Sequence, residues 1–208
     1  MTLQFGFMPS IYDIKPRFQA LLRPLVVILA RSGVTANQVT LAAMALSFIV
    51  GLSVVIWPAA QWPMILIPIA LFVRMALNAI DGMLAREFDM KSRLGAVLNE
   101  LGDVASDAAL YLPFALVPGI SAIAVVLVVI LGIVSEMAGV VAIQIGSSRR
   151  YDGPMGKSDR AFAFGSIGLL LGFGISAGNW LNVVLWVMVG LLFITIVNRS
   201  RQALKAAT

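Results

Sequence analysis

Long apolar runs, separated by short polar stretches, dominate the chain. They cover residues of about 37–57, 62–85, 95–117, 119–147, 160–178 and 180–198. A helix that rises about 1.5 Å per residue needs about 20 apolar residues to cross the hydrocarbon core of a bilayer. The pattern therefore predicts an all-α polytopic membrane protein with six transmembrane helices, and residues 1–208 form a single membrane domain.

The stretch before the first apolar run has a different pattern. Residues 11–31 mix Lys15, Arg17, Arg23 and Arg31 with an apolar run that covers only residues 24–30. Such a run is too short to span a bilayer and lacks the longer core and the cleavage site of a signal peptide. We therefore predict an interfacial amphipathic helix at 11–31, broken or kinked near Pro24.

The positions of the basic residues predict how the helices are oriented. All Lys and Arg residues except Arg74 lie in four segments, at 15–31, 86–93, 149–160 and 199–205. The alternate connections, at 58–63, 117–119 and 176–179, carry no charge. Because cytoplasmic loops of membrane proteins are enriched in Lys and Arg, both termini are predicted on the cytoplasmic side of the membrane.

Composition supports the membrane assignment and narrows the chemistry. Hydrophobic residues make up 60% of the chain and the mean hydropathy is +0.97, against about 45–50% apolar residues in soluble domains. The chain has no Cys and no His, which excludes disulfides, thiolate or imidazole metal ligands and His-based acid–base catalysis. The pI of about 10.1 does not predict a nucleic-acid partner, because the basic residues flank apolar segments.

Residues 74–107 carry polar groups at helical spacing within this apolar sequence. One face of the second predicted span carries Arg74, Asn78, Asp81, Gly82 and Ala85, and a stripe on the third carries Gly95, Asn99, Asp103 and Asp107. An ionisable side chain at membrane depth is costly unless it is paired, metal-bound or hydrated, so such a cluster predicts a functional site. The small residues allow close approach of helices or of a ligand.

This segment resembles the motif of the CDP-alcohol phosphotransferase family, D-x2-D-G-x2-A-R-x8-G-x3-D-x3-D. The matching string is Asn78, Asp81, Gly82, Ala85, Arg86, Gly95, Asn99 and Asp103, with every spacing kept. The segment Thr35-Ala36-Asn37-Gln38-Val39-Thr40 is similar to the T-P-N-x-x-T segment of the family. The resemblance covers nearly the whole chain and implies the same six-helix layout with an interfacial first helix.

The resemblance implies a reaction and a set of site residues. A CDP-linked lipid, such as CDP-diacylglycerol, is attacked by an alcohol, and CMP leaves. One or two Mg²⁺ or Mn²⁺ ions bind the pyrophosphate, with Asp81 as a ligand and Asp103 as both ligand and general base. The substrate-lining positions carried over from the family are Asn37, Thr40, Asn78, Asp81, Gly82, Ala85, Arg86 and Gly95. The resemblance also implies that the protein is a homodimer in contact with membrane lipids.

Two departures from the motif leave the metal site open. Asn78 and Asn99 replace the aspartates that bridge metals in the family. An amide oxygen can ligate Mg²⁺ but brings no negative charge. Three interpretations follow: the site binds one metal, Glu100 or Asp107 restores the lost charge, or the protein binds CDP-lipid or nucleotide without turnover.

Depth within the predicted bundle gives Asp107 a second interpretation. Arg74, Asp107 and Glu136 all lie about 17 Å from the cytoplasmic ends of their spans, by the rise of about 1.5 Å per residue. Opposite charges at one depth in an apolar bundle are expected to pair. We therefore expect a structural cluster of Arg74 with Asp107, Glu136 or both, and keep a catalytic or metal-binding Asp107 as the alternative.

The loop between the fourth and fifth spans is the other informative segment. It carries Arg149, Arg150, Lys157 and Arg160. Basic side chains near this position bind the acceptor phosphate in family members that use phosphorylated alcohols, so these four are candidate ligands of an acceptor phosphate. The sequence is equally consistent with glycerol 3-phosphate, an inositol phosphate or serine as acceptor. A transporter is disfavoured, because no internal repeat is present.

Overall fold

The computed structural model describes residues 11–207, with side chains from residue 16 onward, and this part of the chain is helical without strands. The helices are α1 (Ile11–Arg31), α2 (Ala36–Ile56), α3 (Gln61–Glu87), α4 (Arg93–Tyr111), α5 (Ala122–Val141), α6 (Lys157–Gly172) and α7 (Asn179–Ala206). Two 3₁₀ turns, η1 (Leu112–Leu116) and η2 (Ala142–Ile145), extend α4 and α5. The predicted all-α fold is confirmed.

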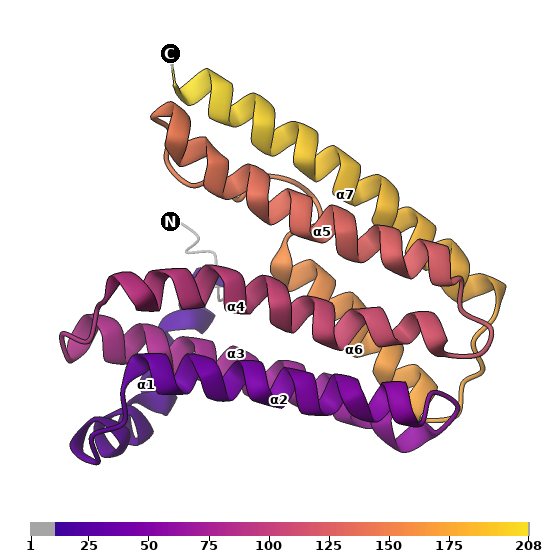
Figure 1. Ribbon diagram of the computed structural model, residues 1–208, viewed down its shortest axis with the longest axis horizontal. Coiled ribbons are helices and arrows are strands. Elements are labelled where there is room, and N and C mark those ends of the chain that lie inside the picture. The colour runs from indigo at the N-terminus through magenta and orange to yellow at the C-terminus, as the bar shows by residue number, and fades with distance from the viewer. Residues whose placement is uncertain (1–10, 208) are drawn as a thin grey trace, which may run out of the picture.

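The helices form two groups that meet at α4, α5 and α6. Helix α2 packs against α3 and α4, α3 packs against α6, and α5 packs against α7 (Figure 1). Tyr111 of α4 stacks on Phe164 of α6 with ring centroids 4.1 Å apart, and Phe114 contacts the same ring edge-on. This aromatic cluster belongs to one hydrophobic core that also includes residues of α5 and α7.

Four of the helices are long and apolar enough to cross a membrane: α2, α3, α5 with η2, and α7, as judged over the described residues. The other two predicted spans do not meet these criteria. Helix α6 has only 16 residues, and α4 carries Arg93, Glu100, Asp103 and Asp107 within 19 residues. The prediction of six spans is thus supported for four helices by these criteria.

Helix α6 is shorter than the predicted span at 160–178 because a glycine ends it. Gly174 has a φ of +86°, a conformation that favours glycine. The N–H groups of Gly174 and Ile175 donate to the carbonyls of Leu171 and Leu170, at 3.0 Å each. This is the Schellman arrangement that terminates many helices, so residues 173–178 form a connection instead of a last turn.

Helix α1 ends at Arg31, as predicted, and lies against α3 (Figure 1). It continues as one helix through Pro16 and Pro24, so of the two predicted alternatives, a break or a kink near Pro24, the break is excluded. Val26 is fully buried and belongs to a cluster that includes Ile80, Met83 and Leu84 of α3. This packing supplies contacts that offset the hydrogen bond lost at the proline.

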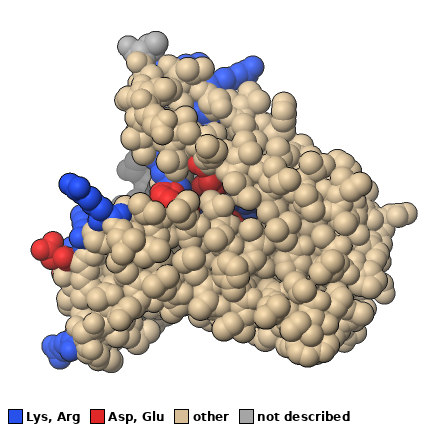
Figure 2. All heavy atoms as spheres, in the orientation of Figure 1, with Lys and Arg blue, Asp and Glu red and all other residues tan. Residues whose placement is uncertain are grey.

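Charged side chains gather at one end of the molecule. On the face shown in Figure 2, Lys, Arg, Asp and Glu lie toward the end where α3 and α5 finish and α2 and α4 begin, and the opposite end is uncharged. The basic segments at 86–93, 149–160 and 199–205 therefore share one end of the bundle. This is the arrangement that the alternation of basic and uncharged connections predicts.

Close packing of α2 on α4 depends on Gly51, which gives a test of the fold. A Cβ at this position would lie 2.0 Å from the carbonyl oxygen of Ala109. Gly51→Ala should lower the stability of the protein by about 1–3 kcal/mol, because α2 and α4 must separate. The melting temperature in detergent is the measurement. Gly190→Ala in α7 is the control, since a Cβ there meets nothing within 4 Å, and a similar loss in both variants would contradict the packing.

Candidate active site

The ends of α2, α3 and α4 enclose a cavity of about 780 Å³, here called the motif cavity. All eight substrate-lining residues predicted from the sequence line it: Asn37, Thr40, Asn78, Asp81, Gly82, Ala85, Arg86 and Gly95. The lining also includes Asn99 and Glu100, together with Lys91, Ser92 and Arg93, which the sequence argument did not identify. The structure thus brings the two halves of the motif together around one space.

Two helix caps fix the mouth of the motif cavity. Thr35 and Gln38 form a capping box at the start of α2, in which each side chain bonds the other's backbone N–H. Ser92 caps α4 by accepting from the Gly95 N–H at 2.9 Å, and it also accepts from Asn37 Nδ2 at 3.4 Å. A Cβ on Gly95 would lie 2.7 Å from Asn37 Oδ1, so glycine is required for this approach.

Asp81 and Arg86 lie on the α3 side of the motif cavity. The Asp81 side chain is buried and its Oδ2 accepts a hydrogen bond from Thr40 Oγ1 at 2.8 Å. A Cβ on Gly82 would lie 3.1 Å from Arg86 Nη1. The absence of a side chain at Gly82 therefore leaves room for the guanidinium of Arg86 beside the cavity.

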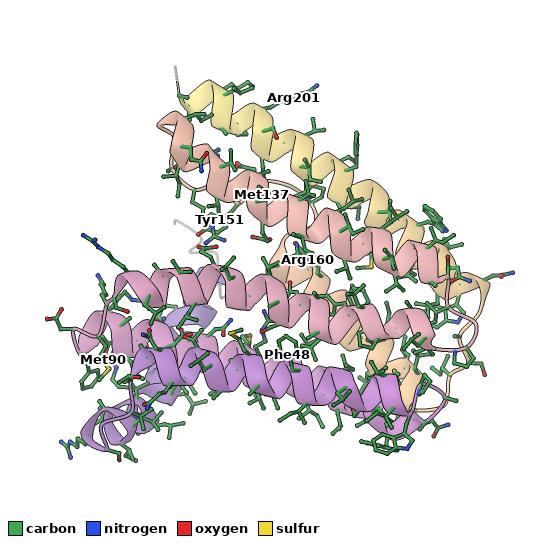
Figure 3. The ribbon with its side chains drawn as sticks, in the orientation of Figure 1. Phe48, Met90, Met137, Tyr151, Arg160 and Arg201 are labelled. Atoms are coloured by element: carbon green, nitrogen blue, oxygen red, sulfur yellow. The ribbon has the colours of Figure 1, made fainter. Side chains whose placement is uncertain are left out.

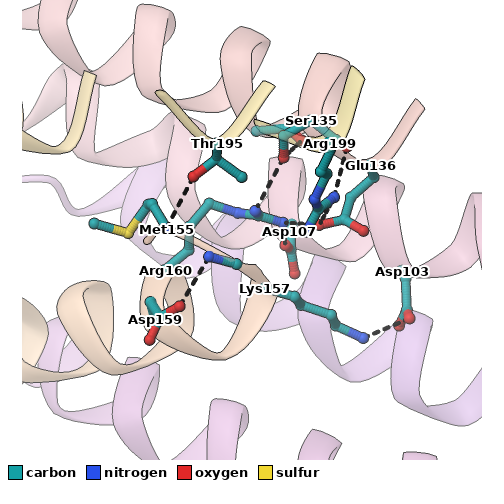
Figure 4. A network of polar contacts seen from close by, with 12 residues as sticks. Asp103, Asp107, Ser135, Glu136, Met155, Lys157, Asp159, Arg160, Thr195 and Arg199 are labelled. Atoms are coloured by element: carbon teal, nitrogen blue, oxygen red, sulfur yellow. Dashed lines mark hydrogen bonds and ion pairs between the residues drawn. The ribbon is translucent and has the colours of Figure 1, made fainter. Parts of the chain in front are cut away.

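Asp103 lies on α4 and is held by three donors. Its Oδ1 accepts from Asn78 Nδ2 at 3.1 Å and pairs with Arg74 Nη2 at 3.3 Å, and its Oδ2 pairs with Lys157 Nζ at 2.5 Å (Figure 4). The side chain is 26% exposed. This carboxylate is thus oriented by groups from α3 and α6 and still reaches the solvent-accessible space.

Deeper in the bundle, four side chains from four helices form a buried ion-pair network. Arg74 Nη1 pairs with Asp107 Oδ1 at 2.6 Å, and Arg160 Nη2 pairs with Asp107 Oδ2 at 3.0 Å and Glu136 Oε1 at 3.2 Å (Figures 3 and 4). The predicted pairing of Arg74 with Asp107 is confirmed. Glu136 joins the network through Arg160, which the sequence argument had placed at an acceptor phosphate.

Arg199 of α7 is a further buried member that the sequence argument missed. Its side chain is 2% exposed, its Nη1 donates to the Ser135 carbonyl at 2.5 Å, and it lies 3.4 Å from Glu136 Oε1. In the sequence, Arg199 follows an apolar span and resembles an ordinary cytoplasmic flanking residue. Its ion-pair partner on α5, Glu136, shows that Arg199 belongs to the buried network.

The four candidate ligands of an acceptor phosphate all have carboxylate partners. Arg149 pairs with Glu100 and with Glu136, and Lys157 pairs with Asp103. Arg150 binds Asp152 through two hydrogen bonds of 2.8 and 3.0 Å, which lower the pKa of the Asp152 carboxyl. Arg160 is buried within the network described above and pairs with Asp107 and Glu136.

The oxygen donors of the motif suit one divalent cation better than two. No group of three or more acidic side chains able to bind a metal occurs within residues 16–207. Glu100 pairs with Arg149, and Asp107 pairs with Arg74 and Arg160, so neither supplies the charge lost at Asn78 and Asn99. Asp103 likewise pairs with Arg74 and Lys157. Two dications need more negative charge than Asp81 alone provides, whereas Asp81 with the amide oxygens of Asn78 and Asn99 would offer ligands for one.

Comparison with known proteins identifies this arrangement. A profile of the CDP-alcohol phosphatidyltransferase family matches residues 33–197. The chain belongs to this family. It is 49% identical to the inner membrane protein YnbA of Escherichia coli (strain K12) over 198 residues, which cover 94% of this chain and 96% of YnbA.

Solved structures share the fold of this CDP-alcohol phosphatidyltransferase. The phosphatidylinositol phosphate synthase PgsA1 of Mycobacterium tuberculosis with CDP-DAG bound matches with a TM-score of 0.71 and 21% identity, over 86% of this chain and 92% of that one. A structure of PgsA1 in complex with manganese and citrate matches with a TM-score of 0.72 and 21% identity, over 88% of each chain. Family membership makes the chain a membrane transferase of phospholipid biosynthesis.

The ion-pair network gives a test that does not depend on activity. Arg74→Leu should destabilise the protein by about 3–5 kcal/mol, because Asp107 and Asp103 lose a buried partner. Thermal melting in detergent measures the loss. Arg23→Leu is the matched control, since the Arg23 pair with Glu87 is exposed, and equal melting of wild type and Arg74→Leu would exclude a structural role for the network.

Proposed function

We propose that this protein transfers a phosphatidyl group from a CDP-linked lipid to an alcohol acceptor and releases CMP, at the bacterial inner membrane. The observation that carries the proposal is the motif cavity, which collects every predicted substrate-lining residue next to Asp103. The family assignment, the CDP-DAG bound to PgsA1 and the inner-membrane location of YnbA support it.

Three basic side chains at the motif cavity suit the donor's pyrophosphate. Arg86, Lys91 and Arg93 line the cavity, and none of them forms an ion pair within the described part of the chain. Arginine and lysine with no carboxylate partner are available to bind phosphate oxygens. We therefore place the cytidine diphosphate group in this cavity.

A second cavity, of about 590 Å³ between α3 and α6, suits the lipid chains. Its walls are apolar along most of their length, with Leu71, Phe72 and Leu169 among the lining residues. At one end it reaches Arg74, Asn78 and Lys157, which surround Asp103. An amphiphile with its phosphate at that end would keep its acyl chains within apolar surroundings.

In this proposal Asp103 is the general base. The acceptor oxygen attacks the β-phosphorus, its proton passes to an Asp103 carboxylate oxygen, and the bond to the bridging oxygen breaks so that CMP leaves. Asn78, Arg74 and Lys157 hold this carboxylate in one orientation. One Mg²⁺ or Mn²⁺ ion, held by Asp81, Asn78 and Asn99, would offset negative charge on the pyrophosphate.

The second candidate function is a family member that binds CDP-lipid or nucleotide without turnover. Asn78 and Asn99 favour it, because both remove a charged metal ligand. The retained Asp103 and its three donors favour catalysis, because a protein that only binds its ligand needs no general base oriented next to the cavity.

We also propose that the chain has six membrane spans and an interfacial α1, that both termini and the active site face the cytoplasm, and that the protein is a homodimer.

The assignment of Asp103 as the base predicts a loss of turnover without loss of fold. Asp103→Asn should reduce CMP release from CDP-diacylglycerol by about 10²–10⁴-fold with any productive alcohol. The control is Asp89→Asn, which changes an exposed carboxylate outside the motif cavity. CMP release by Asp103→Asn at the wild-type rate would defeat the assignment, and no release by wild type with any alcohol would favour the binder.

The donor set predicts the number of metal ions. With CDP-diacylglycerol present, the wild-type protein should bind one Mn²⁺ per chain, measured by electron paramagnetic resonance of the free ion. Asn78→Asp with Asn99→Asp should raise the number to two, because the added carboxylates offset a second dication. Two ions bound to wild type would contradict the single-metal site.

A further inference from the structure

The basic side chains on the two sides of Asp103 differ in whether they pair with a carboxylate. This difference indicates which class of acceptor alcohol the site binds. On the side of the motif cavity, Arg86, Lys91 and Arg93 have no carboxylate partner among the described residues. On the side of the loop 146–156, every one of the basic groups near Asp103 pairs with a carboxylate. We infer that the acceptor is an uncharged polyhydroxyl alcohol and not a phosphorylated one, an inference that rests on the proposed function.

The position of the acceptor follows from the shape of the site. In phosphoryl transfer the attacking and leaving oxygens lie roughly in line, so the acceptor approaches from the side opposite to the leaving CMP. The motif cavity takes the nucleotide and the apolar cavity between α3 and α6 takes the lipid chains. We therefore place the acceptor next to Asp103, at Lys157, which also borders the apolar cavity, and at the pair of Arg149 with Glu100, which also borders the motif cavity.

The basic side chains next to the proposed acceptor position are paired with carboxylates. Arg149 has Glu100 on one Nη and Glu136 on the other, the second at 3.5 Å. Lys157 Nζ lies 2.5 Å from Asp103 Oδ2 (Figure 4). Arg160, one turn further along α6, is 3% exposed and held by two carboxylates.

These ion pairs make the binding of a phosphate group unfavourable for an electrostatic reason. A phosphate monoester carries about −1.5 to −2 charges at neutral pH, and it would have to displace Glu100 or Glu136 from Arg149. The displaced carboxylate stays tethered to its helix and repels the phosphate at short range. An uncharged polyol meets no such repulsion, because its hydroxyls can donate to Glu100 and accept from Lys157 while one hydroxyl faces Asp103.

The experiment compares matched acceptors on the purified full-length protein. Radiolabelled CDP-diacylglycerol is supplied with glycerol or glycerol 3-phosphate, and with inositol or inositol 1-phosphate, and CMP release is measured. The uncharged member of at least one pair should have a kcat/KM at least about tenfold higher than its phosphate ester. A higher kcat/KM for the phosphorylated member of the productive pair would overturn the inference and leave the proposed function standing.

A variant tests whether the carboxylates cause the selectivity. Glu100→Gln removes a negative charge from Arg149 and keeps the side-chain shape, so it should shift the ratio of kcat/KM values toward the phosphorylated acceptor by about tenfold. Glu87→Gln is the control, because Glu87 forms an exposed pair with Arg23 away from the site, and it should leave the ratio unchanged. An unchanged ratio in Glu100→Gln would overturn the role of these carboxylates.

A binding measurement separates this inference from the proposed function. If no alcohol supports CMP release, the proposed function fails, and calorimetric titration of glycerol 3-phosphate into the protein with CMP then tests the inference alone. The inference is supported if glycerol 3-phosphate binds to Glu100→Gln but does not bind detectably to wild type, because Glu100 then excludes phosphate from the site. Binding of glycerol 3-phosphate to wild type as tightly as to Glu100→Gln overturns it.

Discussion

The pairing of charges inside an apolar bundle is the constraint on which the rest of the structure depends. Arg74, Asp107, Arg160 and Glu136 lie on four different helices, and each would be costly to bury without its partners. Arg74 and Glu136 lie on α3 and α5, which meet the criteria for a membrane span, and Asp107 and Arg160 lie on α4 and α6, which do not. The paired charges thus hold α4 and α6 against the rest of the bundle.

The same network orients the proposed base, Asp103. Arg74 bonds both Asp107 in the interior and Asp103 at the site, so one guanidinium links the structural cluster to the proposed base. Lys157, the first residue of α6, reaches Asp103 because Arg160 anchors the same helical turn to Asp107 and Glu136. In the proposed mechanism, the orientation of the Asp103 carboxylate is fixed by basic side chains that are themselves held by carboxylates one turn deeper in the bundle.

Two asparagines in the motif make this chain an informative member of the CDP-alcohol phosphatidyltransferase family. Asn78 keeps a connection to the site by donating to Asp103, while Asn99 lines the motif cavity. The charge lost at these positions is not restored by Glu100 or Asp107, since arginines bind both. The proposals of a single cation and of an uncharged acceptor have this common origin: Glu100, Asp103 and Asp107 already have basic partners.

The sequence by itself determined the helical class and the end of α1, because hydrophobic period and helix length are properties of single helices. The depth of Arg74 in its span predicted a buried partner, Asp107, Glu136 or both, and the resemblance to the family motif predicted residues that line the motif cavity. Only the tertiary structure decided the termination of α6 at Gly174, the burial of Arg199 and the partners of Arg149, Lys157 and Arg160. An isolated basic segment looks free to bind phosphate. Whether it is free depends on which carboxylates other helices bring to it, and that depends on how the helices pack.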